Sequence, residues 1–204
     1  MMKMSTRANS EEPHQAQGIW TKIPFYGIMR KMNYNREKFK QAVLFFATNG
    51  GWDVGKKKLA KLLYFTDFTL YELRKQSLTE MEYTKKDYGP MPEPIVFYGA
   101  LRDLEKEGAI TLEKPNSIKL EKIVPKEKVN LEVFSEAEKQ VLDQILEKYR
   151  AENAGSLERL AQAEPPYKMV VYEEKIPYYL AFYRNSFGEM DLNSDENSDT
   201  HRSI

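Results

Sequence analysis

The segment from Asp53 to Lys75 constrains the fold of this chain most, because it is predicted to be a helix with apolar residues on nearly every side. The residues that line one side at helical spacing are Leu59, Leu62, Leu63, Thr66, Leu70 and Leu73, and those that widen the apolar surface are Tyr64, Phe65, Phe68 and Tyr71. A helix that is apolar nearly all round has to be covered by other elements. We therefore expect a central helix, with Asp53 as its N-cap.

Further helices are predicted around this one. Apolar residues at helical spacing predict a helix over 36–48, which Asn49-Gly50-Gly51 would end. A capping box formed by Ser135 and Glu138 opens another helix, whose buried face is expected to be Val141, Leu142, Ile145 and Tyr149. The remaining helices are expected at 93–107, with a buried face of Phe97, Ala100, Leu101 and Leu104 before Gly108, at 157–163, and at 176–183.

Extended structure is expected in two places. Residues 78–88 show no helical period and are expected to form a short strand or an extended loop, followed by a rigid Gly-Pro turn at 89–94. Residues 110–112 and 118–120 alternate with period two across 114–117, which predicts an antiparallel hairpin. The predicted fold is mainly α (α+β): a helical domain with a small β-hairpin and a winged-helix-like middle section.

The domain is expected to span residues 31–187. Residues 1–30 are predicted to be a flexible leader, and translation from Met29 or Met32 is an open alternative. Residues 188–204 are acidic and rich in Ser, Asn and Asp, so we expect a disordered tail.

Composition narrows the chemistry. The chain has no cysteine, which excludes disulfides and thiol catalysis and favours the cytoplasm, and it has no apolar run near the ~20 residues of a membrane span. Its only histidines, His14 and His201, lie in the predicted tails, and it has no glycine-rich phosphate-binding motif. A site built from carboxylates alone remains open, but we predict neither an enzyme nor a metal or cofactor site.

Charge is distributed unevenly although the net charge is zero. Residues 1–62 hold 12 basic and 4 acidic residues, and the rest holds 19 basic and 27 acidic ones. A basic first third is compatible with nucleic acid or an acidic partner, and equally with solvated helix faces.

Asp67 is the one acid placed within the most apolar segment. A buried carboxylate needs partners, because burying it alone costs several kcal/mol. It is either a structural acid bonded to a Lys, a Tyr hydroxyl or backbone amides, or part of a partner-recognition pocket.

The run Tyr88-Gly89-Pro90-Met91-Pro92 likewise has two interpretations. A preorganised loop with exposed Tyr and Met would lose little entropy on binding a protein. Alternatively, Tyr88 and Met91 pack against the central helix.

The helix at 93–107 and the hairpin after it have the order of a winged helix, which suggests a DNA-binding regulator as an alternative. The helix offers Arg102 and Lys106 but carries more acidic residues than basic ones, which disfavours phosphate contacts.

Several of these patterns together resemble the Panacea domain, also called SocA-like, over roughly residues 34–184. The matching residues are Lys58, Leu59, Lys61, Leu62, Leu63, Tyr64, Phe65 and Asp67, then Tyr88, Gly89 and Pro90, then Leu101, Leu104, Gly108 and Ile110. The family often has Thr-His and then Pro-Trp near its end, where this chain has Ala161-Gln162 and Tyr167.

The resemblance implies a bacterial or phage antitoxin that neutralises a cognate protein toxin by direct binding, in some members as an adaptor for an AAA+ protease. DNA binding is the alternative, and no membrane partner is expected. The partner-binding residues we predict are Tyr64, Asp67, Tyr88, Gly89, Pro90, Met91, Pro92 and Tyr167.

Overall fold

The computed structural model describes residues 34–114 and 121–184, and over these ranges the fold is mainly α with a small β component, as predicted. The predicted leader at 1–30, the tail at 188–204 and the expected strand at 118–120 lie outside the described residues.

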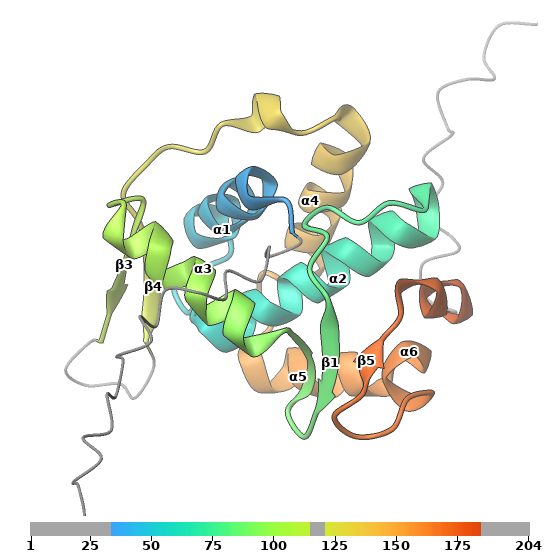
Figure 1. Cartoon of the computed structure of the whole chain (residues 1–204). Helices are drawn as coiled ribbons and strands as arrows, with labels where there is room; N and C mark the ends of the chain where they lie inside the picture. Colours follow the sequence, from blue (N-terminus) through green and yellow to red (C-terminus); the bar gives the residue numbers. More distant parts are fainter. Residues whose placement is uncertain (1–33, 115–120, 185–204) are drawn as a thin grey trace, which may run out of the picture. The chain divides into compact units, whose positions relative to one another are not determined.

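Helices make up most of the fold (Figure 1). The α-helices are α1 (Arg36–Asn49), α2 (Lys56–Arg74), α3 (Pro94–Lys106), α4 (Glu136–Tyr149), α5 (Ala154–Ala163) and α6 (Pro165–Lys168). The described residues also form two 3-10 helices, η1 (Leu131–Val133) and η2 (Tyr178–Tyr183).

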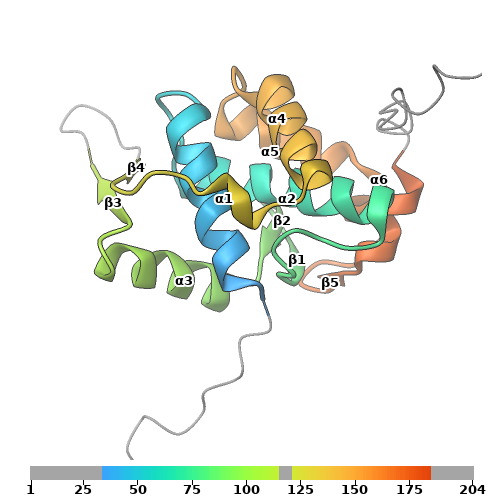
Figure 2. The same cartoon turned by 90° about the horizontal axis from the view of Figure 1, so that it is seen from above.

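Helix α2 is the central helix, as predicted. It packs against α1, α4, α5, η2 and strand β2 (Gly89–Pro92), and Figure 2 shows it running between the other helices. Every residue from Lys58 to Leu70 is buried. The prediction that Asp53 caps this helix is wrong: Gly55 is the N-cap, and Asp53 accepts a hydrogen bond from the Lys58 Nζ at 2.7 Å instead.

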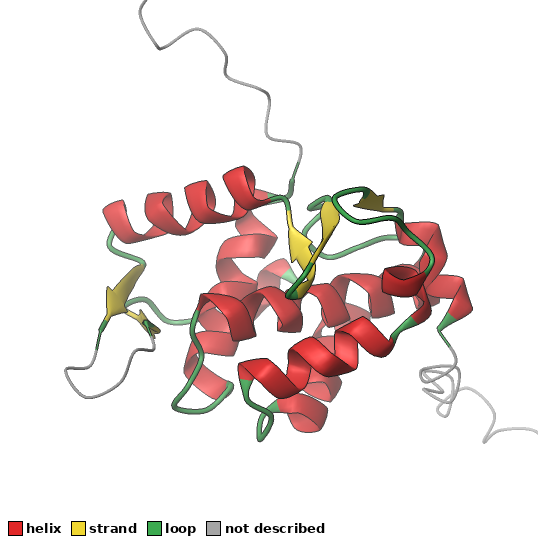
Figure 3. Ribbon diagram, turned by 90° about the horizontal axis from the view of Figure 1, so that it is seen from below, coloured by secondary structure: helices red, strands yellow, loops and turns green. Residues whose placement is uncertain are grey.

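In the part of the chain that the structure describes, the strands form two small antiparallel sheets (Figure 3). One has the order β2-β1-β5, with β1 at Tyr83–Lys86 and β5 at Lys175–Ile176, and the other pairs β3 (Ile110–Glu113) with β4 (Lys122–Pro125). The hairpin after α3 is therefore confirmed, with its second strand at 122–125.

The predicted turn at 89–94 is wrong over its first four residues, because 89–92 form strand β2. Lys85 pairs with Pro90 and Tyr83 pairs with Pro92. A proline cannot donate to a sheet and is therefore found on edge strands, and β2 is at an edge. The turn itself lies at Asp87 and Tyr88, between β1 and β2.

The predicted helix at 176–183 is also corrected. Lys175 and Ile176 form β5, with Ile176 opposite Tyr83 of β1, and Pro177 is the N-cap of the short 3-10 helix η2. This pairing joins segments far apart in sequence, which local periodicity does not report.

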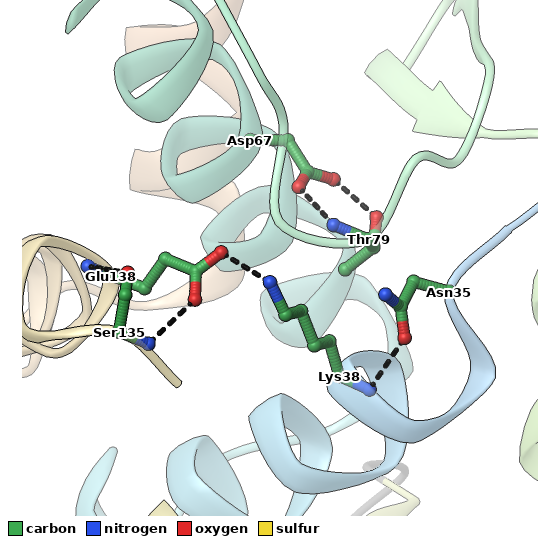
Figure 4. Close-up of polar contacts among 6 residues, drawn as sticks. All are labelled: Asn35, Lys38, Asp67, Thr79, Ser135 and Glu138. Atoms are coloured by element: carbon green, nitrogen blue, oxygen red, sulfur yellow. Dashed lines mark hydrogen bonds and ion pairs between the residues drawn. The ribbon is translucent and has the colours of Figure 1, made fainter. Parts of the chain in front are cut away.

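The predicted capping box at the start of α4 is present and also bonds α1 (Figure 4). Glu138 accepts from the Ser135 backbone N–H at 2.9 Å and from the Lys38 Nζ at 2.6 Å. The buried faces of α3 and α4 are those predicted.

Candidate functional site

Three buried polar residues of α2 bond segments outside the helix. Lys58 donates to Asp53 at 2.7 Å and to the Arg150 carbonyl at 2.9 Å. Lys61 donates to the Pro90 carbonyl of β2 at 2.6 Å, and Asp67 accepts from the loop that precedes β1. The central helix therefore positions the surrounding loops through buried polar side chains.

Asp67 is enclosed, with 0% of its surface exposed. Its Oδ1 accepts from the Thr79 backbone N–H at 2.8 Å, as Figure 4 shows, and its Oδ2 accepts from the Thr79 hydroxyl at 2.5 Å and the Tyr83 hydroxyl at 2.7 Å. Burial raises the pKa of Asp67 to about 6, and these hydrogen bonds oppose the rise. The geometry matches the structural interpretation of this acid.

Lys61 is a buried cation beside the turn between β1 and β2. It is 2% exposed, and its Nζ lies 5.6 Å from the centre of the Tyr88 ring. Burial lowers the pKa of Lys61 to about 8, with nearby Lys57 lowering it further and Glu158 opposing the change.

A cavity of about 220 Å³ opens beside this lysine. Its walls come from α2, the β1–β2 hairpin, α3 and α5, and the residues that line it are Lys57, Lys61, Tyr88, Met91, Tyr98 and Glu158. The cavity thus combines aromatic walls with two lysines and one carboxylate.

Two side chains that line this cavity, Tyr88 and Tyr98, are also exposed, as is Ile95 on α3. Ile95 is 78% exposed, Tyr98 38% and Tyr88 37%. Ile95 and Tyr98 are three residues apart on α3 and so share one face of that helix. We call Tyr88, Ile95 and Tyr98 the Tyr88 patch.

The C-terminal part of the chain holds the turn from its other side. Gln162 of α5 donates to the Asp87 carbonyl at 2.6 Å, and the Tyr167 hydroxyl donates to the Lys86 carbonyl at 2.9 Å. The Lys85 Nζ also lies 4.5 Å from the centre of the Tyr167 ring. The turn is therefore fixed between α2 and the α5–α6 segment.

The same segments carry a family match. Residues 59–168 match the family model described as Antitoxin SocA-like, Panacea domain. The chain belongs to this family. No curated protein and no solved structure matches the chain.

Gln162 and Tyr167, at which the sequence is expected to differ from the family pattern, both bond the β1–β2 hairpin. Their neighbour Ala161 is buried. In this chain, Gln162 and Tyr167 therefore contribute hydrogen bonds that shape this hairpin.

The structure places the predicted partner-binding residues around one hairpin of the Panacea domain. Tyr88 is at the surface and Tyr167 is half-buried, whereas Gly89, Pro90, Met91 and Pro92 form the buried strand β2. Tyr64 and Asp67 lie inside, where Tyr83 of β1 contacts both: its ring centre is 5.6 Å from that of Tyr64, and its hydroxyl bonds Asp67. Tyr64 and Asp67 can act on a partner only by supporting the surface in this conformation, and their role in binding stays a prediction.

Lys61, Tyr98 and Glu158 were not among the predicted site residues. A signal for Lys61 was present, because a lysine within a helix that is apolar nearly all round has to be buried and needs partners. Nothing local marks Tyr98 or Glu158, since only the packing of α3 and α5 brings them to the cavity.

Other kinds of site find little support in residues 34–114 and 121–184. Within these ranges no cluster of three His, Cys, Asp or Glu is arranged to hold a metal ion, and no helix has both the length and the apolar character to cross a membrane. In helix α3, Lys106 forms an ion pair with Asp103 at 3.7 Å.

Gly89→Ala is expected to destabilise the fold and disturb Lys61. Gly89 has φ +88°, and a Cβ there would lie 3.2 Å from the Lys61 Nζ. The left-handed backbone alone costs about 1–2 kcal/mol for a residue with a side chain. We expect about 1–3 kcal/mol lower stability by denaturant unfolding, together with a shifted Lys61 NMR signal.

Gly99→Ala is the matched control. A Cβ at Gly99 in the middle of α3 would meet no atom within 4 Å. Alanine is the better helix former, so this change should raise stability by up to about 1 kcal/mol. Equal effects of the two substitutions would contradict the role assigned to Gly89.

Proposed function

We propose that this Panacea-domain protein is a cytoplasmic antitoxin that neutralises a protein toxin by stoichiometric binding, without catalysis, through the Tyr88 patch and its cavity. The family supports an antitoxin role. The observation that supports this location is a cluster of exposed aromatic and aliphatic side chains beside a cavity, on a hairpin held from both sides.

The rigidity of the hairpin favours tight binding. Ordering a loop costs free energy on association, and a preorganised surface avoids much of that cost. The bonds from Lys61, Gln162 and Tyr167 fix the backbone of the β1–β2 hairpin in the free protein. Tyrosine is also enriched at protein interfaces and among residues that dominate binding energy.

The patch alone would be the centre of a larger contact. Stable protein complexes bury about 1,200–2,000 Å² in total. The neighbouring surfaces of α3 and α5 would supply the rim of such an interface, and residues at its centre would contribute most of the affinity.

The direct experiment is growth rescue with the adjacent gene as the candidate toxin. Growth arrest by the neighbour alone and recovery on co-expression would support neutralisation, and a harmless neighbour would count against it. Immunoblots of the toxin separate two mechanisms: an unchanged level indicates occupation of the toxin, and a level that falls only when an AAA+ protease is present indicates an adaptor.

Tyr98→Ala is expected to weaken toxin binding by about ten- to a hundredfold, since truncating a central tyrosine typically costs about 1.4–3 kcal/mol, with about 1.4 for each factor of ten. Tyr179→Ala is the matched control, an exposed tyrosine on η2. Isothermal titration calorimetry with the purified toxin measures both.

If Tyr98→Ala and Tyr179→Ala lost the same affinity for the toxin, the interface would not be centred on the Tyr88 patch. The salt dependence of binding distinguishes toxin binding from the alternative function, DNA binding. The affinity for DNA falls steeply with salt concentration, because it depends on phosphate contacts.

A further inference from the structure

Lys61 is a buried ammonium group whose positive charge is only partly compensated. It has three N–H donors, and the acceptor found for it among the described residues is the Pro90 carbonyl. A carbonyl oxygen accepts a hydrogen bond but does not neutralise a charge. Burying a cation without a counter-ion is costly, so the free protein holds this group in an unfavourable state.

The cavity gives this charge access to a ligand. Lys61 lines the cavity together with Lys57 and Glu158. Glu158 is close enough to raise the pKa of Lys61, yet none of the ion pairs in the described ranges joins these two residues. With two lysines and one carboxylate, the lining carries a net charge of one positive unit.

The size of the cavity limits what enters it. Pockets for drug-sized ligands and cofactors have volumes of about 300–1,000 Å³, and this cavity has about 220 Å³. Tyr88, Tyr98 and Met91 supply walls that favour an organic group. The space suits one inserted side chain better than a cofactor.

From the cavity, its charge and its walls, we propose that the cavity is a receptor for one acidic side chain, whose carboxylate bonds Lys61 while its stem packs between Tyr88 and Tyr98. This deepens the proposed function, on which it rests, since the toxin would supply the side chain. A single carboxylate matches the net charge of the lining. A phosphate dianion would keep an excess negative charge against Glu158 and the aromatic walls.

The inference can be tested on the free protein, independently of any toxin. The probe is sodium phenylacetate, a carboxylate on an aromatic group, and phenylacetamide is its neutral isostere. The NMR signal of the Lys61 side chain in lysine-labelled protein reports binding and the pKa. We expect saturable shifts in the millimolar range and a Lys61 pKa raised by about one unit or more, because a nearby opposite charge stabilises the ammonium.

Variants of the lining residues test whether the NMR response to phenylacetate comes from this cavity. Lys61→Met should abolish phenylacetate binding, as seen at the neighbouring Met91 methyl group, whereas Lys57→Met should weaken it only a few-fold. Glu158→Gln changes a half-buried side chain at constant size and should tighten binding at pH 6.5, because it removes a repelling charge. This last variant keeps the test valid if Lys61→Met does not fold.

The result that overturns the proposal is an equal response to phenylacetate and phenylacetamide, or no response to phenylacetate in the tens of millimolar. A response to inorganic phosphate without one to phenylacetate would overturn it too. If phenylacetate does not bind, the growth-rescue experiment can still succeed. If growth rescue fails, the phenylacetate result still stands. The antitoxin function and the carboxylate receptor can therefore be tested separately.

Once a toxin complex is available, the sign of the pKa change is decisive. An inserted carboxylate raises the pKa of Lys61 above its free value of about 8, whereas an apolar cover lowers it further.

Discussion

Asp67→Ala is expected to lower the melting temperature by about 10 °C or more. The substitution leaves the Thr79 N–H, the Thr79 hydroxyl and the Tyr83 hydroxyl without an acceptor in the interior. Each such orphaned group costs about 1–3 kcal/mol, so the three together would lower the free energy of unfolding by about 3–9 kcal/mol.

Asp67→Asn should cost less than Asp67→Ala. Its amide oxygen can accept from the Thr79 N–H, and its NH₂ group can donate to the two hydroxyl oxygens once these rotate. Asp143→Ala is the matched control, because Asp143 is an exposed acid in the middle of α4 and its loss should change stability by less than about 0.5 kcal/mol. Urea unfolding of the three variants checks the order.

The pH dependence gives a second measure of the same site. The pKa of Asp67 is raised from 3.8 to about 6 in the folded protein, so the native state binds this proton more tightly than the unfolded state. The contribution of Asp67 to stability is therefore most favourable below pH 4. It declines as the pH rises from there to about 6, by about 1.4 kcal/mol for each pH unit.

Subtracting the stability of Asp67→Asn at each pH isolates this contribution, since the variant has no carboxyl group there. A difference that stays constant between pH 4 and 7 would contradict the raised pKa. A cooperative, wild-type melting curve for Asp67→Ala would show that the bonds to Thr79 and Tyr83 contribute little, and it would favour the partner-recognition interpretation of this acid.

The helices were predictable because their signals are local. The apolar period of α2, the capping box of α4 and the buried face of α3 all follow from residues within a few turns of one another. Strand β5 was not predictable in this way, because two residues become a strand only by pairing with β1, some ninety residues earlier in the chain.

Strand β2 shows how a strong local signal can mislead. Its prolines favour a loop in isolation, and only the edge position in the sheet makes them acceptable as strand residues. The same hairpin was nevertheless selected as a site from its Tyr-Gly-Pro run, because an exposed aromatic residue and restricted backbone are local properties.

The candidate site was predictable only in part for the same reason. Tyr88 and Met91 were identified from sequence, whereas the cavity beside them depends on Lys61, Tyr98 and Glu158 from three separate helices. The buried pair of Glu164 and Arg184 was missed too, because nothing in either neighbourhood indicates the other residue.

Arg184→Met is expected to destabilise the protein by about 3–5 kcal/mol, because it leaves the buried Glu164 and the half-buried Glu72 without the guanidinium. Arg184 is buried and donates to Glu164 Oε1 from Nε at 3.0 Å and from Nη2 at 2.7 Å. Its Nη1 donates to the Thr69 hydroxyl at 3.1 Å and lies 3.6 Å from Glu72. These bonds join the end of the described chain to α2 and to the start of α6.

The loss of stability in Arg184→Met should be smaller at acidic pH than at alkaline pH. Burial raises the pKa of Glu72, and Arg184 opposes that rise while Glu164 adds to it. Without the guanidinium the pKa of Glu72 climbs further, so the folded variant holds a proton more tightly than its unfolded chain does. Urea unfolding should therefore show a smaller gap between wild type and Arg184→Met at pH 5 than at pH 8.

Two further variants separate charge from geometry. Arg184→Lys keeps the charge but cannot bond Glu164 through a planar fork, so its loss should be intermediate. Arg74→Met removes an exposed arginine from the end of α2 and should have little effect. If Arg184→Met matched Arg74→Met, the bonds of Arg184 would contribute little to holding η2, which Tyr178 also anchors through its bond to the Met81 carbonyl. If instead the expected order holds, hydrogen exchange should show η2 and α6 opening together in Arg184→Met, because Arg184, at the end of η2, bonds Glu164 at the start of α6 and Thr69 of α2.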